Sequence, residues 1–445
     1  MATKVTPISG FPELLPAQRL AELHVLDVVR RTFELHGYTS LETRSLEPVA
    51  RLLGKGGDAD KEIYAVSRLA AGADESKDAS LGLHFDLTVP FARYVLENAG
   101  RLNFPFRRYQ IQKSWRGERP QEGRFREFTQ ADIDVVDVGD LPSHVEAEMP
   151  LVIAEIFEQL PLGEFRVRCN NRKIPQGFYL GIGLTDLVGT LRTVDKLDKI
   201  GPDAVRAQLV AAGASVEQAD ACLALAQICT TDTSFVDQVR ALGVSHPLLE
   251  EGLGILAEVM AAAELATRPG RVVADLAIAR GLDYYTGTVY ETQIAGFESW
   301  GSVAGGGRYD ALASDGKVTY PGVGISIGVT RLVQLLISKR GLSASRSTPA
   351  AVLVAVNEEA SRTDSLAVAT ALRSRGIPCE VAPRADRFGK QIRYADRRGI
   401  PYVWFPGDQG DQVKDIRSGV QVGAQAQTWQ CPQEDLRPSL VIQEP

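Results

Sequence analysis

The densest group of chemically capable side chains lies in the run RGLDYYTGTVYE, residues 280–291. It combines a guanidinium, a carboxylate and two adjacent phenols: Arg280, Asp283, Tyr284 and Tyr285. The β-forming residues around Gly287 predict a strand, a tight turn and a second strand. Neighbouring side chains of a strand point to opposite faces, so one tyrosine would pack inward while the other lines a pocket. Taken alone, the run also allows a hairpin with an incidental surface arginine.

A second group is cationic. Four arginines lie within the span 116–126, in a charged loop: Arg116, Arg119, Arg124 and Arg126. Guanidinium groups are planar forks suited to phosphate oxygens, and four of them would repel one another unless an anion joined them. The alternative is a solvated loop in which the neighbouring glutamates are the partners. Alternation in YQIQKSW and in FTQADIDVVDV predicts two antiparallel strands with one lined face around this loop, between residues 106 and 138.

A further arginine, Arg331, follows the glycine-rich strand pattern PGVGISIG and opens a helical pattern. A cation at the start of a helix opposes the helix dipole, which indicates an anion nearby. The alternative is an ordinary exposed arginine. The phosphate-loop pattern G-x-x-x-x-G-K-[ST] does not occur in the sequence. The residues alone leave both interpretations of Arg331 open.

Bulk properties limit the class of protein. A chain of 445 residues should hold two or three domains. Its net charge of −7 gives no global attraction to nucleic acid, although a local basic surface would suffice for RNA. The scattered cysteines form no C-x-x-C pair, so we expect reduced thiols and no zinc site: Cys169, Cys222, Cys229, Cys379 and Cys431. Without a signal-peptide pattern or an apolar run of roughly 18 residues, we expect a soluble cytoplasmic protein.

The elements that position these groups follow from periodicity. Residues 16–37 predict a long amphipathic helix ended by glycine. Residues 185–268 are rich in alanine and leucine and predict a helical insertion. Small residues at 343–349 predict a linker, and the alternating strand and helix patterns after it predict a separate α/β domain.

Five segments in this order resemble one known family. They are LHFDLTVP from Leu83, FPFRRYQIQKSWRGERPQEGRFREFTQADIDVVD from Phe104, the RGLDYYTG run, AGGGRYD from Ala304 and PGVGISIGVTRL from Pro321. The chain resembles the histidyl-tRNA synthetases, a class II aminoacyl-tRNA synthetase family. RGLDYYTG is the specific part of the match, whereas the arginine-rich segments belong to class II enzymes more broadly.

The resemblance implies an α/β fold, with an α+β catalytic domain on a mainly antiparallel sheet flanked by helices. We expect its first part at residues 1–184, a helical insertion at 185–268, its second part at 269–342 and a C-terminal α/β anticodon-binding domain at 343–445. It also implies a homodimer. Arg44 stands where the family's interface strand usually has a proline.

The resemblance also assigns an amino-acid pocket. The ammonium of histidine would be bound by Asp86, Thr88 and Gln130, and the imidazole by Asp134 and Tyr285, with Tyr284 lining the same pocket. Many bacterial members carry glutamate at the two aspartate positions. Arg280 would be catalytic, supplying positive charge to the histidine carboxylate and to the phosphate that it attacks. The glycines of AGGGRYD would leave the pocket wall open to a ligand.

For ATP, the resemblance implies that Arg116 is catalytic and binds the α-phosphate. Arg124 and Arg331 would bind the terminal phosphates, Phe128 would stack on adenine, and Glu118 would meet the adenine edge. Magnesium would accompany ATP as part of the substrate. We expect no tightly bound cofactor and no metal site in the protein.

For tRNA, the resemblance places Arg119 and Gln121 at the acceptor end and the C-terminal domain at the anticodon. Residues 384–398 carry six basic and two acidic side chains with Phe388 and Tyr394 between them, and Arg387, Lys390 and Arg393 are the contacts we expect. The alternative is a solvated helix face with Tyr394 packed inward. Neither DNA nor a membrane is an expected partner.

The implied reaction is the activation of L-histidine by ATP and the transfer of histidine to the 3′ end of its tRNA. One alternative is a non-catalytic relative that serves as a regulatory subunit or as a sensor of uncharged tRNA. Such chains usually lose the RGLDYY run, the phosphate-binding arginines or the C-terminal domain, and this chain keeps all three. The other alternative is a class II synthetase for a different amino acid.

Overall fold

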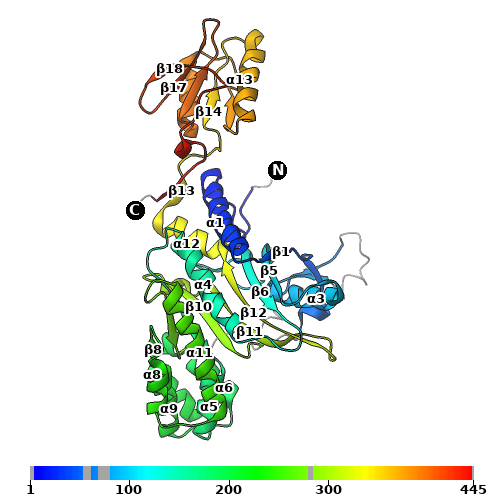
Figure 1. Cartoon of the computed structure of the whole chain (residues 1–445), viewed down its shortest axis with the longest axis vertical. Helices are drawn as coiled ribbons and strands as arrows, with labels where there is room; N and C mark the ends of the chain where they lie inside the picture. The colour runs from blue at the N-terminus through cyan, green and yellow to red at the C-terminus, as the bar shows by residue number, and fades with distance from the viewer. Residues whose placement is uncertain (1–4, 54–61, 69–80, 279–283, 443–445) are drawn as a thin grey trace. The chain divides into compact units, whose positions relative to one another are not determined.

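The computed structural model describes residues 5–53, 62–68, 81–278 and 284–442 (Figure 1). The chain divides into two compact units. The first comprises Met1–Pro12 and Val28–Gln334, and the second comprises Glu13–Asp27 and Leu335–Pro445. Each unit has its own buried apolar cluster, around Phe91 and Tyr309 in the first and around Trp404 in the second.

The first unit is built on a nine-stranded sheet in the order β1-β5-β6-β12-β11-β10-β7-β9-β8. From β5 to β7, every neighbouring pair is antiparallel. The predicted mainly antiparallel sheet is therefore confirmed. A second sheet has the order β2-β4-β3. The strands are β1 (Thr39–Ser40), β2 (Leu46–Pro48), β3 (Ala65–Val66), β4 (Leu81–Leu83), β5 (Phe106–Trp115), β6 (Glu127–Val136), β7 (Phe165–Asn171), β8 (Cys229–Thr230), β9 (Val272–Asp275), β10 (Thr288–Ile294), β11 (Ala304–Ser314) and β12 (Thr319–Gly328).

The predicted strand pair around the arginine loop is confirmed as β5 and β6, and its alternation has a structural meaning. One face of the pair carries polar side chains: Arg108, Gln110, Gln112, Gln130, Asp132 and Asp134. The other face carries apolar ones, including Ile111, Ala131 and Ile133. Because successive residues alternate between faces, a single strand pair supplies both a core face and a polar face. We call the second the ligand face.

Glycines of β11 and β12 keep the neighbouring part of the ligand face free of side chains. Gly324 is paired with Asp134 in the β6–β12 register. A Cβ atom at Gly324 would lie 2.1 Å from the Asp134 Oδ1 atom. A Cβ atom at Gly307 would lie 3.0 Å from the Tyr285 ring. The AGGGRYD segment is therefore a strand rather than a turn, and its glycines make room for the polar and aromatic groups around it.

Helices flank the sheet, and Ala- and Leu-rich ones form most of residues 187–266 (green in Figure 1). The predicted helix from Pro16 is confirmed; it ends at Leu35, and Gly37 turns the chain with a φ of 75°. The helices are α1 (Pro16–Leu35), α2 (Val49–Leu52), α3 (Thr88–Asn98), α4 (His144–Glu158), α5 (Lys173–Gly181), α6 (Leu187–Val194), α7 (Leu197–Ile200), α8 (Pro202–Ala211), α9 (Val216–Ala226), α10 (Phe235–Ala241), α11 (Pro247–Ala266) and α12 (Val329–Arg340).

Of the strand, tight turn and second strand predicted around Gly287, the second strand is confirmed as β10 (Thr288–Ile294), whereas the first strand is wrong at Tyr284 and Tyr285. Residues 279–283, including Arg280, lie outside the described residues. Tyr284, Tyr285 and Gly287 precede β10 without belonging to a strand. The two tyrosine rings touch each other, with centroids 4.8 Å apart and planes at 72°, and both pack on the same apolar cluster. The aromatic pair thus gains burial in a turn, which β-propensity alone does not reveal.

The second unit confirms the predicted α/β pattern of the C-terminal region. Its five-stranded sheet has the order β15-β14-β16-β17-β18, with parallel pairing about β14. Its elements are β13 (Leu342–Ala344), β14 (Val352–Val354), α13 (Arg362–Ser374), β15 (Cys379–Val381), α14 (Phe388–Arg398), β16 (Tyr402–Phe405), β17 (Asp411–Asp415), β18 (Gln421–Ala424) and β19 (Leu440–Ile442). None of the helices in the described ranges combines the length and apolar character that a bilayer crossing requires.

Candidate active site

Four predicted or neighbouring polar side chains meet in the buried interior of the first unit. Gln130, Asp132 and Asp134 project from the ligand face of β6, and Asp86 lies just before α3. The exposed fractions are 8% for Gln130, 2% for Asp132, 2% for Asp134 and 4% for Asp86. The Asp86 Oδ1 atom accepts a hydrogen bond of 3.0 Å from the backbone N–H of Val89, which fixes the carboxylate against the first turn of α3.

Asp134 is held by two partners that the sequence did not reveal. The Asp134 Oδ2 atom lies 2.5 Å from the Arg108 Nη2 atom, and the Tyr309 hydroxyl donates a 2.8 Å hydrogen bond to Oδ1. Arg108 has no exposed surface, and its guanidinium lies 4.2 Å from the Phe91 ring centroid. Burying a carboxylate is costly unless it is paired and hydrogen-bonded, and these contacts supply both requirements.

Burial changes the protonation of the carboxyl groups. It raises the pKa of Asp132 to about 7, against the lowering effect of Arg108. Burial likewise raises the pKa of Asp134 to about 6, against Arg108 and the hydrogen bond from Tyr309. The pKa of Asp86 is also raised by burial. For each of the three carboxyl groups, the effect of burial outweighs the compensating contacts, and a cationic ligand would stabilise the charged form.

Three oxygen atoms of this pocket find no hydrogen-bond donor within the described part of the chain: Asp86 Oδ2, Gln130 Oε1 and Asp132 Oδ1. We call them the open acceptors. Buried polar atoms in folded proteins are nearly always hydrogen-bonded, so a group of such oxygens marks a place where a ligand donates.

The two tyrosines close this pocket. The Tyr284 ring makes edge contacts with Tyr285 and with Tyr309, the latter at a centroid separation of 6.2 Å. Arg172 anchors the turn by donating a 2.9 Å hydrogen bond to the Tyr285 carbonyl. Burial raises the pKa of the Tyr285 phenol, and the three pocket aspartates raise it further. The phenol is therefore protonated at neutral pH and can donate a hydrogen bond.

The arginine cluster lies at the other end of β6 and its loop. Arg116 donates a 3.1 Å hydrogen bond from Nε to the Phe85 carbonyl, and its guanidinium lies 5.0 Å from the Phe128 ring centroid. Arg124 pairs with Glu118 at 3.1 Å. The guanidinium of Arg331 donates a 2.6 Å hydrogen bond to the Gly123 carbonyl and another to the Ser302 carbonyl. Carbonyl partners fix a guanidinium without neutralising it, so Arg116 keeps its attraction for phosphate.

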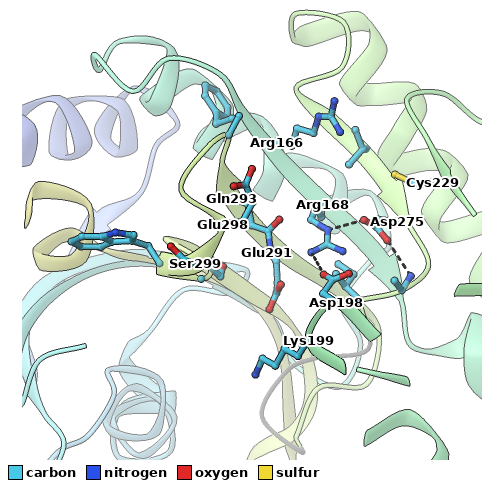
Figure 2. A pocket seen from close by; sticks show the side chains of 18 of the residues that line it. Arg166, Arg168, Asp198, Lys199, Cys229, Asp275, Glu291, Gln293, Glu298 and Ser299 are labelled. Carbon is cyan, nitrogen blue, oxygen red and sulfur yellow. Dashed lines mark hydrogen bonds and ion pairs between the residues drawn. The ribbon is translucent and has the colours of Figure 1, made fainter. Parts of the chain in front are cut away.

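A cavity of about 1440 Å³ opens beside this cluster. Its lining includes Gln121, Arg124 and Arg331 together with residues of β7, β10 and the region of α7. Figure 2 shows Arg168 in its wall, held between Asp275 at 2.7 Å and Asp198 at 3.1 Å. A pocket of this size exceeds the 300–1,000 Å³ typical of sites for small molecules.

Comparison with known proteins decides the family. The family model described as histidyl-tRNA synthetase matches residues 10–332, and an anticodon-binding-domain model matches residues 350–421. A "Histidine--tRNA ligase" of Cutibacterium acnes is 58% identical over 98% of this chain and 99% of its own length. The chain belongs to the histidyl-tRNA synthetases.

Other histidyl-tRNA synthetases agree. A relative from Micrococcus luteus, also named "Histidine--tRNA ligase", is 59% identical over 97% of this chain and 98% of its own. The crystal structure of histidyl-tRNA synthetase from Nostoc sp. PCC 7120 superposes with a TM-score of 0.85 at 34% identity, covering 95% of this chain and 97% of that one. The fold class predicted from the resemblance is thereby confirmed.

A structure from Bacillus halodurans, described as an ATP phosphoribosyltransferase regulatory subunit/histidyl-tRNA synthetase, superposes with a TM-score of 0.72 at 18% identity. It covers 88% of this chain and 97% of its own. At that identity, the likeness concerns the fold alone.

In this histidyl-tRNA synthetase chain, the structure brings together most residues predicted from the sequence. Phe128, Gln130 and Asp134 share the ligand face, while Asp86, Thr88, Tyr284 and Tyr285 adjoin it. Arg119 and Gln121 are exposed on the loop between β5 and β6. Arg280 lies outside the described residues, so its position relative to the pocket stays a prediction.

The predicted anticodon contacts lie in the second unit. Arg387 directly precedes α14, which carries Lys390 and Arg393, and all three are exposed. A pocket of about 630 Å³ includes Arg384, Lys390, Arg393 and Arg397 in its lining. The Tyr394 hydroxyl donates a 3.2 Å hydrogen bond to Glu380 and its ring packs on the core, whereas Phe388 is 42% exposed. Phe388 is thus the aromatic side chain better placed for stacking on a base.

Sequence reasoning missed Arg108 and Tyr309 and left the role of Asp132 open. The available signal was the alternation R-x-Q-x-Q in β5 beside Q-x-D-x-D in β6, which places polar groups on one face. The register that sets Arg108 opposite Asp134 could not be read from the sequence. Among the residues with described positions, no cluster of histidine, cysteine or acidic side chains could hold a metal ion.

Proposed function

We propose that this chain is a histidine–tRNA ligase that first forms histidyl-adenylate and pyrophosphate from L-histidine and ATP. The ribose hydroxyl at the 3′ end of the tRNA then attacks the adenylate carbonyl and releases AMP. One observation carries the proposal: open acceptors in an acidic pocket lie on the same sheet face as the Arg116–Phe128 pair. Membership of the family, at 58% identity to a histidine–tRNA ligase, supports it.

The amino-acid end of the site would read histidine by its hydrogen-bond donors. Asp86 and Gln130 offer open acceptors to the ammonium, and Thr88 lies at the start of α3 beside them. Asp134 and the protonated phenol of Tyr285 would address the imidazole, and Tyr284 would close the pocket over it. A site that hydrogen-bonds a substrate group on a buried surface rejects analogues without that group by on the order of 10⁴, which makes a separate editing site unnecessary.

The nucleotide end would act by placement and charge. Arg116 would stabilise the charge that builds on the α-phosphate, while Arg124 and Arg331 would bind the terminal phosphates of magnesium-bound ATP. Phe128 would stack on adenine, and Glu118 would receive the adenine amino group. Binding of ATP would release Glu118 from its ion pair with Arg124 and so free both groups for the ligand.

The remaining contacts concern tRNA and assembly. Arg119 and Gln121 would meet the acceptor end, and Arg387, Lys390 and Arg393 would meet the anticodon. We further propose a cytoplasmic homodimer, as the family resemblance implies. These roles are supported by the exposure of the five side chains and by the match to the anticodon-binding domain.

Histidine-dependent exchange of pyrophosphate into ATP tests the proposal. Labelled pyrophosphate should enter ATP with histidine and with none of the other nineteen amino acids. No exchange with any amino acid would indicate a regulatory or tRNA-sensing relative, and exchange with a different amino acid would indicate another specificity.

The role of Arg280 is tested by the same assay. Arg280→Ala should lower the exchange kcat by about 10²- to 10³-fold while changing the KM for ATP far less. Arg268→Ala, a change of a 68%-exposed arginine on the surface, is the matched control and should retain wild-type exchange. Survival of exchange within a few-fold in Arg280→Ala would contradict the assigned role.

A further inference from the structure

One carboxylate of the pocket has no role in the family-based assignment. Asp132 lies between Gln130 and Asp134 on β6, is 2% exposed, and offers Oδ1 as one of the open acceptors. A buried carboxylate oxygen that finds no donor within the described ranges is costly to keep. Its place beside two other open acceptors indicates a donor supplied by the substrate.

Ser326 links Asp132 to Gln130. Ser326 is paired with Asp132 in the β6–β12 register, and its hydroxyl accepts a 2.8 Å hydrogen bond from the Gln130 Nε2 atom. A hydrogen bond with Ser326 also lowers the pKa of the Asp132 carboxyl. A hydroxyl has a single hydrogen, so Ser326 accepts from the Gln130 amide and donates to the Asp132 carboxylate. This series of hydrogen bonds leaves Gln130 Oε1 and Asp132 Oδ1 as the acceptors without a donor among the described residues.

The neighbouring polar groups of the pocket already have partners within the protein. Asp134 already forms an ion pair with Arg108 through Oδ2 and accepts a hydrogen bond from Tyr309 on Oδ1, so it is not among the open acceptors. The Thr88 hydroxyl is engaged with the Tyr284 phenol. The three open acceptors therefore remain, and a primary ammonium has three N–H donors.

The charges of the pocket also favour a cationic group. Asp86, Asp132 and Asp134 bring three negative charges, and Arg108 compensates one of them. Arg116 lowers the pKa of Asp86, so it acts on the pocket from the nucleotide side. A substrate ammonium would bring a further positive charge to this acidic pocket.

We propose that Asp132, together with Asp86 and Gln130, binds the α-ammonium of the amino-acid substrate and thereby selects for a free α-amino group. This assignment rests on the proposed function. It makes Asp132 a substrate-binding residue that acts on the amino group rather than on the ring.

Two alcohols that contain the imidazole ring distinguish a contact of Asp132 with the amino group from a contact with the ring. Histidinol carries the ammonium, and 3-(imidazol-4-yl)propan-1-ol lacks it but keeps the ring. Their inhibition constants are measured in histidine-dependent pyrophosphate exchange, or by calorimetry where exchange is too slow. Asp132→Asn should weaken histidinol by about 10- to 100-fold, because one hydrogen bond between charged groups is lost. The deamino compound should bind the variant within about 3-fold of its affinity for the wild type. This change is well below the loss of about 10-fold or more that is expected for histidinol.

Equal weakening of both compounds would overturn the proposal, because it would show a ring contact or a general structural role. Unchanged histidinol binding would overturn it as well. Asp137→Asn, at the solvent end of the same strand segment, is the matched control for loss of a carboxylate. Ser326→Ala keeps the Asp132 carboxylate but removes the hydroxyl that holds it. It should weaken histidinol binding by about 3- to 10-fold, and it should again leave the deamino compound nearly unaffected. If Asp132→Asn does not fold, Ser326→Ala alone decides.

Measurements on the wild-type protein distinguish a failure of the role of Asp132 from a failure of the proposed function. Histidine-dependent exchange in the wild type with no selective effect in either variant would overturn the role of Asp132 alone. Absence of both exchange and histidinol binding in the wild type would overturn the proposed function and this assignment together.

Discussion

Replacing Arg108 by methionine should destabilise the first unit in a pH-dependent manner. Arg108 has no exposed surface and lies 2.5 Å from Asp134, and methionine would keep the packing on Phe91 while removing the charge. Removing one partner of a buried ion pair costs about 3–5 kcal/mol. At roughly 2 °C per kcal/mol for a unit of this size, the unfolding temperature should fall by roughly 6–10 °C at pH 8.

The sign of the pH dependence follows from the raised pKa values. Asp132 and Asp134 have folded-state pKa values of about 7 and about 6, above their ordinary value of 3.8, so the folded protein binds their protons more tightly. Stability from these groups is present at low pH and is lost as pH rises through 6 to 7. Without Arg108, both pKa values rise further, so protonation at pH 5.5 should remove roughly half or more of the deficit.

Thermal unfolding of Arg108→Met and wild type at pH 5.5 and pH 8 checks this reasoning. Arg206→Met is the control, because Arg206 pairs with Asp220 at 2.5 Å on the surface, where both side chains are nearly half exposed. Such a pair contributes about 0–1 kcal/mol, so the control should change little at either pH. An equal deficit at both pH values would refute the argument that buried carboxylate charge causes the loss.

Three further changes probe separate parts of the site. Gly324→Ala should raise the KM for histidine at least about 10-fold and leave the KM for ATP unchanged, because the new Cβ atom would lie 2.1 Å from Asp134 Oδ1. Equal changes in both KM values would contradict this. Phe128→Leu should raise the KM for ATP about 10-fold and spare histidine, since base stacking contributes about 1–3 kcal/mol, and steady-state exchange kinetics measure both. Lys390→Ala combined with Arg393→Ala should raise the KM for tRNA roughly 10-fold in aminoacylation, with exchange intact; loss of exchange would show a folding defect instead.

Periodicity predicted the parts of this fold whose pattern is local. The alternation in β5 and β6, the helix from Pro16 and the strand–helix order of the second unit all follow from neighbours in the sequence. The turn at Tyr284 and Tyr285 was mispredicted because two aromatic residues satisfy a strand preference and a buried turn equally well. Tertiary packing on the cluster around Tyr309 decides between them.

The candidate site was predictable in residue type but not in pairing. The sequence indicated a polar face on β6, yet the partners of Asp134 come from β5 and β11, and only the registers of β5, β12 and β11 bring them together. The proposed role of Asp132 depends on its Oδ1 atom, which finds no hydrogen-bond donor in the described part of the chain. A sequence pattern cannot show this, because it depends on the three-dimensional surroundings of the atom. The roles of the individual residues stay predictions until the kinetic tests are made.

Phe128, Gln130, Asp132 and Asp134 lie two residues apart on a single strand, so about 6.6–6.8 Å of covalent backbone separates each from the next. The strand β6 therefore fixes the spacing between these side chains. In the proposed roles, the distance between a base stacked on Phe128 and an amine bound by the carboxylates would be set by the backbone geometry of β6, which is paired on both sides. Fluctuations of surrounding loops would then alter how quickly reactants arrive, while the spacing at which they meet stays constant.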